Sequence, residues 1–198
     1  SKGMIYYKKA NKLFLEAKQS SLNILSQRYP NFNQWIKKDL EIIFEVNDTY
    51  DLYWLAASMA GAIQSSRGSN PYELINIPTI GKLLETAIFL DPTWENGSLF
   101  SAMMSYSAIR PDLSGQAMKD TVDYYFKKSL EISDSLDASV FVSYAELIHK
   151  PRQEKRHFED KLKHVINMDL NKKNKLNNLI SINRAKWLMS NTKDYFLE

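Results

Sequence analysis

A short helical segment recurs three times along this chain. The three copies are LLETAIFLDPT at 83–93, YFKKSLEISDS at 125–135 and KLKHVINMDLN at 161–171. When they are aligned, three columns of mainly apolar residues lie three positions apart: Leu84, Phe126 and Leu162; Ala87, Ser129 and Val165; Leu90, Ile132 and Met168. This spacing is typical of one face of an α-helix. The copies begin roughly 40 residues apart, which indicates a repeat unit of two helices and a turn. We therefore predict an all-α solenoid of helix pairs.

Proline, glycine and capping residues divide the rest of the chain into helices. A first helix is predicted over 3–29, ended by Pro30, and a second over 32–46. Capping oxygens at 47–49 precede a third helix at 50–66, whose many small residues favour an interior position. Further helices are predicted over 77–91, 98–110, 114–132, 138–149, 153–168 and 175–190, and no strand is expected. We expect one helical domain over 1–198, with N-terminal helices at 1–49 and the repeat array at 50–198.

The charge balance argues against nucleic-acid binding. The 198 residues include 26 lysines and arginines and 23 aspartates and glutamates, a net charge of +3, and the two signs are interspersed. Phosphate recognition needs a concentrated basic face. The densest basic stretch, Lys172, Lys173 and Lys175, is instead expected to be a solvated helix connection.

Cysteine is absent, so the chain has no disulfide, no thiolate nucleophile and no thiolate metal ligand. The longest apolar stretch, 53–63, is about half of the ~20 residues that a membrane-spanning helix needs. Residues 1–3 do not resemble a signal peptide, but a mature N-terminus would look the same, so export stays open.

Two further features of the sequence point to a family. Ala87 and Pro92 fit the end of the second helix of a tetratricopeptide repeat, although the units exceed the ~34 residues of that repeat. The chain also resembles the T component of TRAP transporters, the tripartite ATP-independent periplasmic uptake systems. The resemblance rests on YWLAASMAGAIQSS at 53–66, IPTIGKLLETAIFLDPTWENGSLF at 77–100, Arg110-Pro111, FVSYAELIHKPRQEKRHFEDKL at 141–162 and NRAKWLMSNTKDYFLE at 183–198.

The resemblance implies a tetratricopeptide-like fold and an exported periplasmic protein that is lipid-anchored in its full-length form. It also implies a homotrimer that docks with the P component, the solute-binding protein of the transporter, and handles a hydrophobic or organic-acid ligand. The family's acylated cysteine is absent from this sequence, and we expect it to precede Ser1.

Common catalytic and metal-binding patterns are missing. The only histidines are His149, His157 and His164, and their spacing does not suit a helical metal site, so we expect surface or capping roles. The chain contains no G-x-S-x-G and no phosphate-binding glycine loop, and carboxylates such as Glu154 and Glu159 fall on a highly charged helix. We therefore predict no catalytic residue, no metal, no cofactor and no enzymatic activity.

Aromatic residues on the first helices of successive pairs are better candidates for binding, because those helices line the concave face of a solenoid. Tyrosine and tryptophan combine apolar area with one polar group, which suits an organic ligand or a partner loop. With two polar neighbours, the predicted groove consists of Tyr53, Trp54, Phe100, Tyr106, Phe141, Tyr144, Asn183, Arg184 and Trp187. Two alternatives stay open: most of these rings belong to the core, and Arg184 forms an ion pair with Glu146.

The sequence thus predicts a non-catalytic accessory of a TRAP uptake system, which binds the P component and passes ligand between the partner's cleft and its own aromatic interior. The alternative is a generic tetratricopeptide adaptor that grips a peptide of another protein. A peptide adaptor should present a polar, carboxylate-binding groove, whereas a ligand conduit should present an apolar one.

Overall fold

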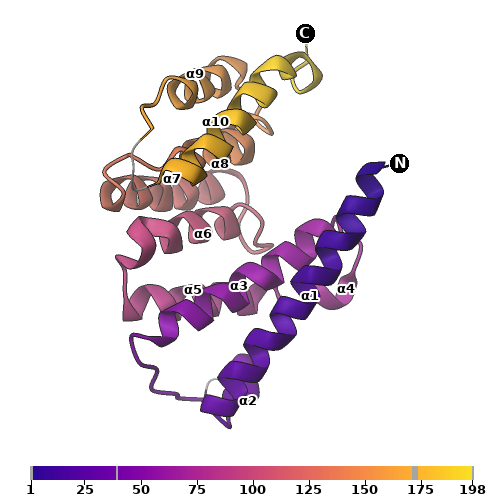
Figure 1. Cartoon of the computed structure of the whole chain (residues 1–198), viewed down its shortest axis with the longest axis vertical. Coiled ribbons are helices and arrows are strands. Elements are labelled where there is room, and N and C mark those ends of the chain that lie inside the picture. Colours follow the sequence, from indigo (N-terminus) through magenta and orange to yellow (C-terminus); the bar gives the residue numbers. More distant parts are fainter. Residues whose placement is uncertain (1, 39, 171–173, 198) are drawn as a thin grey trace. The chain divides into compact units, whose positions relative to one another are not determined.

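The computed structural model describes residues 2–38, 40–170 and 174–197, and within these ranges all regular secondary structure is helical (Figure 1). The α-helices are α1 (Lys2–Arg28), α2 (Phe32–Lys37), α3 (Asp48–Ser65), α4 (Pro71–Leu74), α5 (Ile77–Leu90), α6 (Ser98–Ser107), α7 (Gly115–Ile132), α8 (Ala138–Tyr144), α9 (Lys155–Ile166) and α10 (Lys175–Ser190). Three shorter turns are η1 (Trp94–Gly97), the π-helical turn η2 (Ala145–His149) and η3 (Thr192–Asp194). The all-α prediction is confirmed.

The chain divides into two compact units, Ser1–Trp94 and Glu95–Glu198. The boundary follows α5 and lies inside the segment that we assigned to one repeat array. The organisation as a single domain stays a prediction. Lys172 and Lys173, in the predicted basic connection, lie outside the described residues.

Helix α3 is the centre of the first unit, where it packs against α1 on one side and α5 on another (Figure 1). Its small residues lie in the interior, as predicted. A Cβ atom added at Gly61 would meet ring carbons of Phe14 in α1 at 2.4 Å. Helix α1 can therefore approach α3 this closely only because residue 61 has no side chain.

The second predicted helix, 32–46, is wrong beyond α2, which ends at Lys37. The aromatic ring of Phe44 returns to α2 and lies 5.0 Å from that of Trp35, edge to face. Lys82 of α5 donates hydrogen bonds to the carbonyl oxygens of Trp35 and Lys38 at 2.6 and 3.1 Å. The two carbonyl oxygens bonded to Lys82 would have accepted backbone amides if the helix had continued.

Asp48 does not act as the predicted helix cap. Its carboxylate accepts hydrogen bonds from the Arg28 guanidinium, the Tyr29 hydroxyl and the amide of Glu45, while the Asn47 side chain makes no capping bond. Burial alone would raise the pKa of Asp48, but these three bonds outweigh burial and hold the pKa below its usual value. The segment before α3 is thus fixed by an ion pair with α1.

The aligned repeat columns predicted which residues are buried in α5 of the first unit and in α7 and α9 of the second unit. All six residues of the first two columns are buried, and Leu90, Ile132 and Met168 of the third column are half-buried. In the second unit, α6 packs on α7, and α8, α9 and α10 pack on one another. Ser129 donates a hydrogen bond to the carbonyl of Gly97 at 3.2 Å, and Gly97 has a φ of 92°, which favours glycine. The spacing therefore located the buried face of each copy.

Candidate ligand-binding cleft on helix α9

Helix α9 carries two adjacent stripes of side chains in the second unit. Phe158, Leu162 and Val165 are fully buried in the core. One residue earlier at each position, His157, Lys161 and His164 line a cleft of about 560 Å³. The remaining lining residues are Asp123, Phe126 and Lys127 of α7, Phe141 and Tyr144 of α8, His149 of η2 and Asp160 of α9. The cleft therefore lies where α7, α8, η2 and α9 meet.

The ammonium group of Lys161 lies among three aromatic rings. Its Nζ atom is 5.1 Å from the ring centroid of Phe126, 5.8 Å from that of Phe141 and 5.7 Å from that of Tyr144. Burial lowers the pKa of Lys161, against the smaller opposing effect of Asp123. The three rings stabilise the cation by cation–π attraction, but they do not neutralise its charge.

The neighbouring carboxylates are occupied by other partners. Asp123 forms an ion pair with Lys119 at 2.6 Å and accepts a hydrogen bond from the Tyr144 hydroxyl. This bond, together with burial, raises the pKa of Tyr144 and keeps its hydroxyl protonated. Asp160 pairs with Lys163 at 4.0 Å. In the described part of the chain no carboxylate forms an ion pair with Lys161, although the lining carboxylates, Asp123 and Asp160, equal the lining lysines, Lys127 and Lys161, in number.

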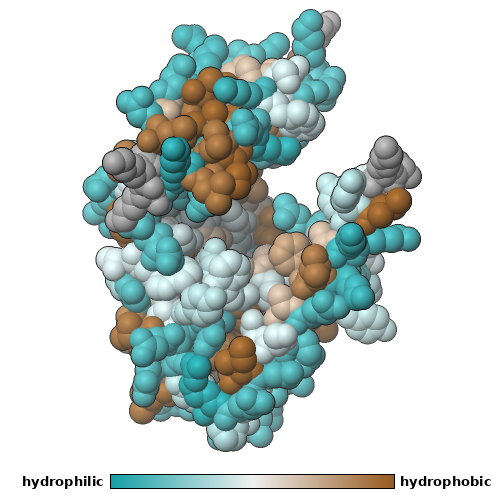
Figure 2. All heavy atoms as spheres, in the orientation of Figure 1, coloured by the Kyte–Doolittle hydropathy of each residue, from teal (hydrophilic) through white to brown (hydrophobic). Residues whose placement is uncertain are grey.

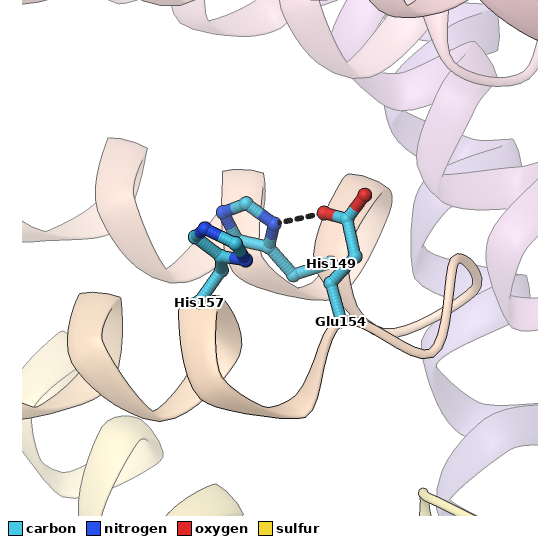
Figure 3. Close-up of side chains that lie close together, drawn as sticks. All are labelled: His149, Glu154 and His157. Atoms are coloured by element: carbon cyan, nitrogen blue, oxygen red, sulfur yellow. Dashed lines mark hydrogen bonds and ion pairs between the residues drawn. The ribbon is translucent and has the colours of Figure 1, made fainter.

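His149, Glu154 and His157 form a cluster (Figure 3), and its two histidines line the cleft. The His149 Nδ1 atom lies 2.7 Å from a carboxylate oxygen of Glu154, and the imidazole rings of His149 and His157 stack at 5.4 Å. Burial lowers the pKa of His149, opposed by its bond to Glu154, and the same bond lowers the pKa of Glu154. His149 is therefore neutral and donates its Nδ1 hydrogen to an ionised Glu154. The expected surface role is wrong for His149, which is 7% exposed.

The predicted groove residues are divided between the two units, and within the second unit only two of them line the cleft. Phe141 and Tyr144 lie in the cleft. Phe100 and Tyr106 of α6 are buried in the core of the same unit. Tyr53 belongs to the first unit, where its ring lies 4.6 Å from that of Trp94.

Trp54 is 47% exposed on the surface of the first unit, beside the rings of Tyr50 and Tyr53. Four of the seven predicted aromatic residues, Phe100, Tyr106, Phe141 and Tyr144, are thus buried, which agrees with the alternative that most of these rings belong to the core.

Asn183, Arg184 and Trp187 lie on the exposed face of α10, and Trp187 is 50% exposed. Arg184 pairs with Glu146 at 2.6 Å, which confirms the second alternative, and its guanidinium lies over the Trp187 ring at 4.7 Å. Figure 2 shows apolar side chains gathered over the α10 region of the second unit. The exposed apolar side chains of this helix include Leu176, Leu179 and Ile180.

Three residues of the cleft were missed by sequence reasoning. Phe126 was assigned only to the core, Lys161 was not distinguished from surface lysines, and His149 was not paired with Glu154. The signal for Lys161 was present, because His157, Lys161 and His164 have the same four- and three-residue spacing as the core stripe.

The model of the TRAP transporter T-component family matches residues 2–196 of the chain. An uncharacterized protein of Treponema pallidum (strain Nichols) is 25% identical over 203 residues, which cover 97% of this chain and 62% of that protein. The chain thus spans less than two thirds of that relative. Within the described residues, no helix is both long and apolar enough to cross a membrane. The chain belongs to the TRAP transporter T-component family.

Proposed function

We propose that this chain is a non-catalytic accessory of a periplasmic TRAP uptake system that binds the P component and a small organic acid. Family membership supports the accessory role. The ligand is inferred from one observation, the ammonium of Lys161 among three aromatic rings with no carboxylate paired to it in the described chain. A partly buried ammonium group that makes no close ion pair is costly, and a ligand carboxylate would offset that cost.

The dimensions and lining of the cleft suit a small molecule. A volume of about 560 Å³ falls within the roughly 300–1,000 Å³ of small-ligand pockets. Phe126, Phe141 and Tyr144 offer apolar area for the carbon skeleton of the ligand, while Lys161 meets its carboxylate. A peptide adaptor would instead distribute polar contacts along a longer groove.

Isothermal titration calorimetry with a series of monocarboxylates of increasing chain length tests the ligand. We expect Lys161→Met to weaken binding at least tenfold, because the variant keeps the length and apolar stem of the side chain but loses its charge. Lys163→Met is the matched control, since Lys163 lies exposed on the same helix. The thermal stability of Lys161→Met should equal or exceed that of the wild type, because the variant removes a partly buried charge. Equal affinities of wild type and Lys161→Met for every carboxylate would refute the proposal.

The partner surface is proposed on α10. Leu176, Ile180, Asn183 and Trp187 follow a four-, three- and four-residue spacing, so they share one face, and all four are exposed. Exposed apolar side chains beside a cation are typical of protein-binding surfaces. The P component is proposed to dock here, and ligand would pass between the two proteins.

Native mass spectrometry of the chain alone and with the P component encoded nearest to its gene tests this surface. We expect a homotrimer that takes up the P component, and we expect Trp187→Ala to reduce the complex while the exposed neighbour substitution Lys186→Ala does not. A monomer that forms no such complex would favour the peptide adaptor. The periplasmic location, the lipid anchor of the full-length protein and the tetratricopeptide-like solenoid belong to the same proposal.

A further inference from the structure

The turn between η2 and α9 has an unusual local geometry that brings His149 and Glu154 together. The amide of Lys150 bonds to the carbonyl of Ala145 at 3.0 Å, which widens the last turn of the helix. Gln153 then has a φ of 58°, and the amide of Glu154 bonds back to the carbonyl of His149 at 2.9 Å. Widened turns and left-handed non-glycine residues recur at functional sites, because the local cost must be offset by the surrounding structure.

The third member of the cluster comes from the first turn of α9. His157 follows Glu154 by three residues, so both side chains project from the same side at the start of the helix. One nitrogen of each histidine and one oxygen of Glu154 lie within 4.8 Å of one another. The cluster also has an unsatisfied atom: the Nε2 atom of His149 is buried and has no hydrogen-bond partner in the described chain. This nitrogen lies on the opposite side of the ring from Nδ1, so it takes no part in the bond to Glu154.

We propose that His149, Glu154 and His157 bind a divalent transition-metal ion of the Zn²⁺ class at the α9 cleft (Figure 3). Two imidazole nitrogens and one carboxylate oxygen are a ligand set that Zn²⁺ accepts, with a fourth position left for water. Ligand atoms around a tetrahedral zinc ion, with bonds of about 2.0–2.1 Å, lie roughly 3.3 Å apart. The ion would replace the Nδ1 hydrogen of His149, so this nitrogen and the Glu154 oxygen, now 2.7 Å apart, would separate slightly, and the ligand atoms of the cluster start no more than 4.8 Å apart. His157 is exposed and can rotate to adjust the position of its nitrogen.

The ligand types of the cluster favour one class of ion over the others. Arg152 donates to the second oxygen of Glu154 at 2.9 Å, and Lys161 lies in the same cleft, so both cations oppose a positively charged ligand. Hard ions such as Ca²⁺ and Mg²⁺ require several oxygen ligands, and this cluster offers one carboxylate. An ion that bonds well to imidazole nitrogen gains more here, which favours Zn²⁺ over Ca²⁺ and Mg²⁺.

Calorimetric titration of chelator-treated protein with Zn²⁺ tests the site, with Ca²⁺ titrated in parallel. We expect one Zn²⁺ per chain and at least a tenfold loss of affinity in His157→Ala and in Glu154→Gln. His164→Ala is the matched control, because His164 lines the same cleft but is outside the cluster. The chain has three histidines in all, so this set leaves little ambiguity about which imidazoles bind.

A second measurement protects the test against misfolded variants. Zn²⁺ should raise the melting temperature of the wild type and of His164→Ala, but not that of His157→Ala. Because the His157 side chain is exposed, its removal should disturb folding little. Absence of stoichiometric Zn²⁺ binding, or an equal loss in His164→Ala and His157→Ala, would overturn the assignment. The result does not depend on the organic acid, so the ligand proposal and the metal proposal can fail separately.

Discussion

Asn178 of α10 is expected to be the most costly single polar residue to remove from the second unit. It is buried, and its side-chain oxygen accepts a hydrogen bond from the amide of Ala138 at 3.0 Å. Its side-chain nitrogen donates to the carbonyl of Leu136 at 2.8 Å. One amide side chain therefore satisfies two backbone groups at the start of α8, a helix more than thirty residues away in sequence.

Replacement of Asn178 by alanine leaves both backbone groups without their partners. Each buried group that loses its hydrogen bond costs about 1–3 kcal/mol, and water that enters the vacated space recovers part of this, so we expect a loss of about 2–4 kcal/mol. Asn177→Ala is the matched control: the same residue type lies one position earlier on the same helix, and its side chain is exposed. That substitution should change stability by less than about 0.5 kcal/mol.

Urea unfolding followed by circular dichroism measures the free energy, and hydrogen exchange locates the effect. We expect the amide of Ala138 to lose protection in Asn178→Ala, while amides of the first unit keep theirs. If Asn178→Ala and Asn177→Ala were equally stable, with Ala138 equally protected in both, the two side-chain bonds would not hold α8 and the reasoning would fail.

Three further substitutions test the first unit. Gly61→Ala should destabilise the first unit by about 1–3 kcal/mol through overlap with the Phe14 ring, and the higher helix propensity of alanine should offset ~1 kcal/mol of this. Adding Phe14→Ala to the same chain should reduce the loss, which thermal unfolding measures. The ammonium group of Lys18 lies 2.7 and 2.8 Å from the two oxygens of the buried Glu73 carboxylate. Lys18→Met leaves this carboxylate unpaired and should lower the free energy of unfolding by about 3–5 kcal/mol in urea, and Lys18→Arg should recover part of the loss. The pKa of Asp48 is lower in the folded state, so its contribution to stability is complete above its unfolded pKa of about 3.9 and is lost as the pH falls through the folded value. Asp48→Asn should therefore reduce the loss of stability between pH 5 and acid. Unfolding at a series of pH values measures this difference.

The buried face of the repeat could be predicted from the sequence because helical periodicity is a local property. Leu84, Phe126 and Leu162 repeat at the same point of similar segments, and their burial follows from that spacing. The second helix could not be placed correctly, because its end depends on Phe44 and Lys82, which reach α2 from elsewhere in the chain. Periodicity carries no information about such tertiary contacts.

The candidate site was harder to predict than the core for a similar reason. Phe141 and Tyr144 were selected as aromatic residues, but what makes their surroundings a site is the burial of Lys161 beside them. A lysine in a sequence does not reveal whether a carboxylate will reach it. The pairing of His149 with Glu154 likewise depends on the widened turn of η2 and on the left-handed Gln153, neither of which has a sequence signature.

Helix α9 carries core residues and cleft-lining residues on adjacent faces. Its two stripes are displaced by one residue, which is about 100° around a helix, so the buried Phe158 and the cleft-lining His157 belong to different surfaces. The core stripe needs only apolar residues of suitable size. The cleft stripe instead holds a cation whose pKa is lowered by burial and which has no carboxylate paired to it in the described chain. A helix that served only to hold the second unit together would be more stable with a neutral residue at position 161. The charge of Lys161 therefore supports the proposed organic-acid ligand.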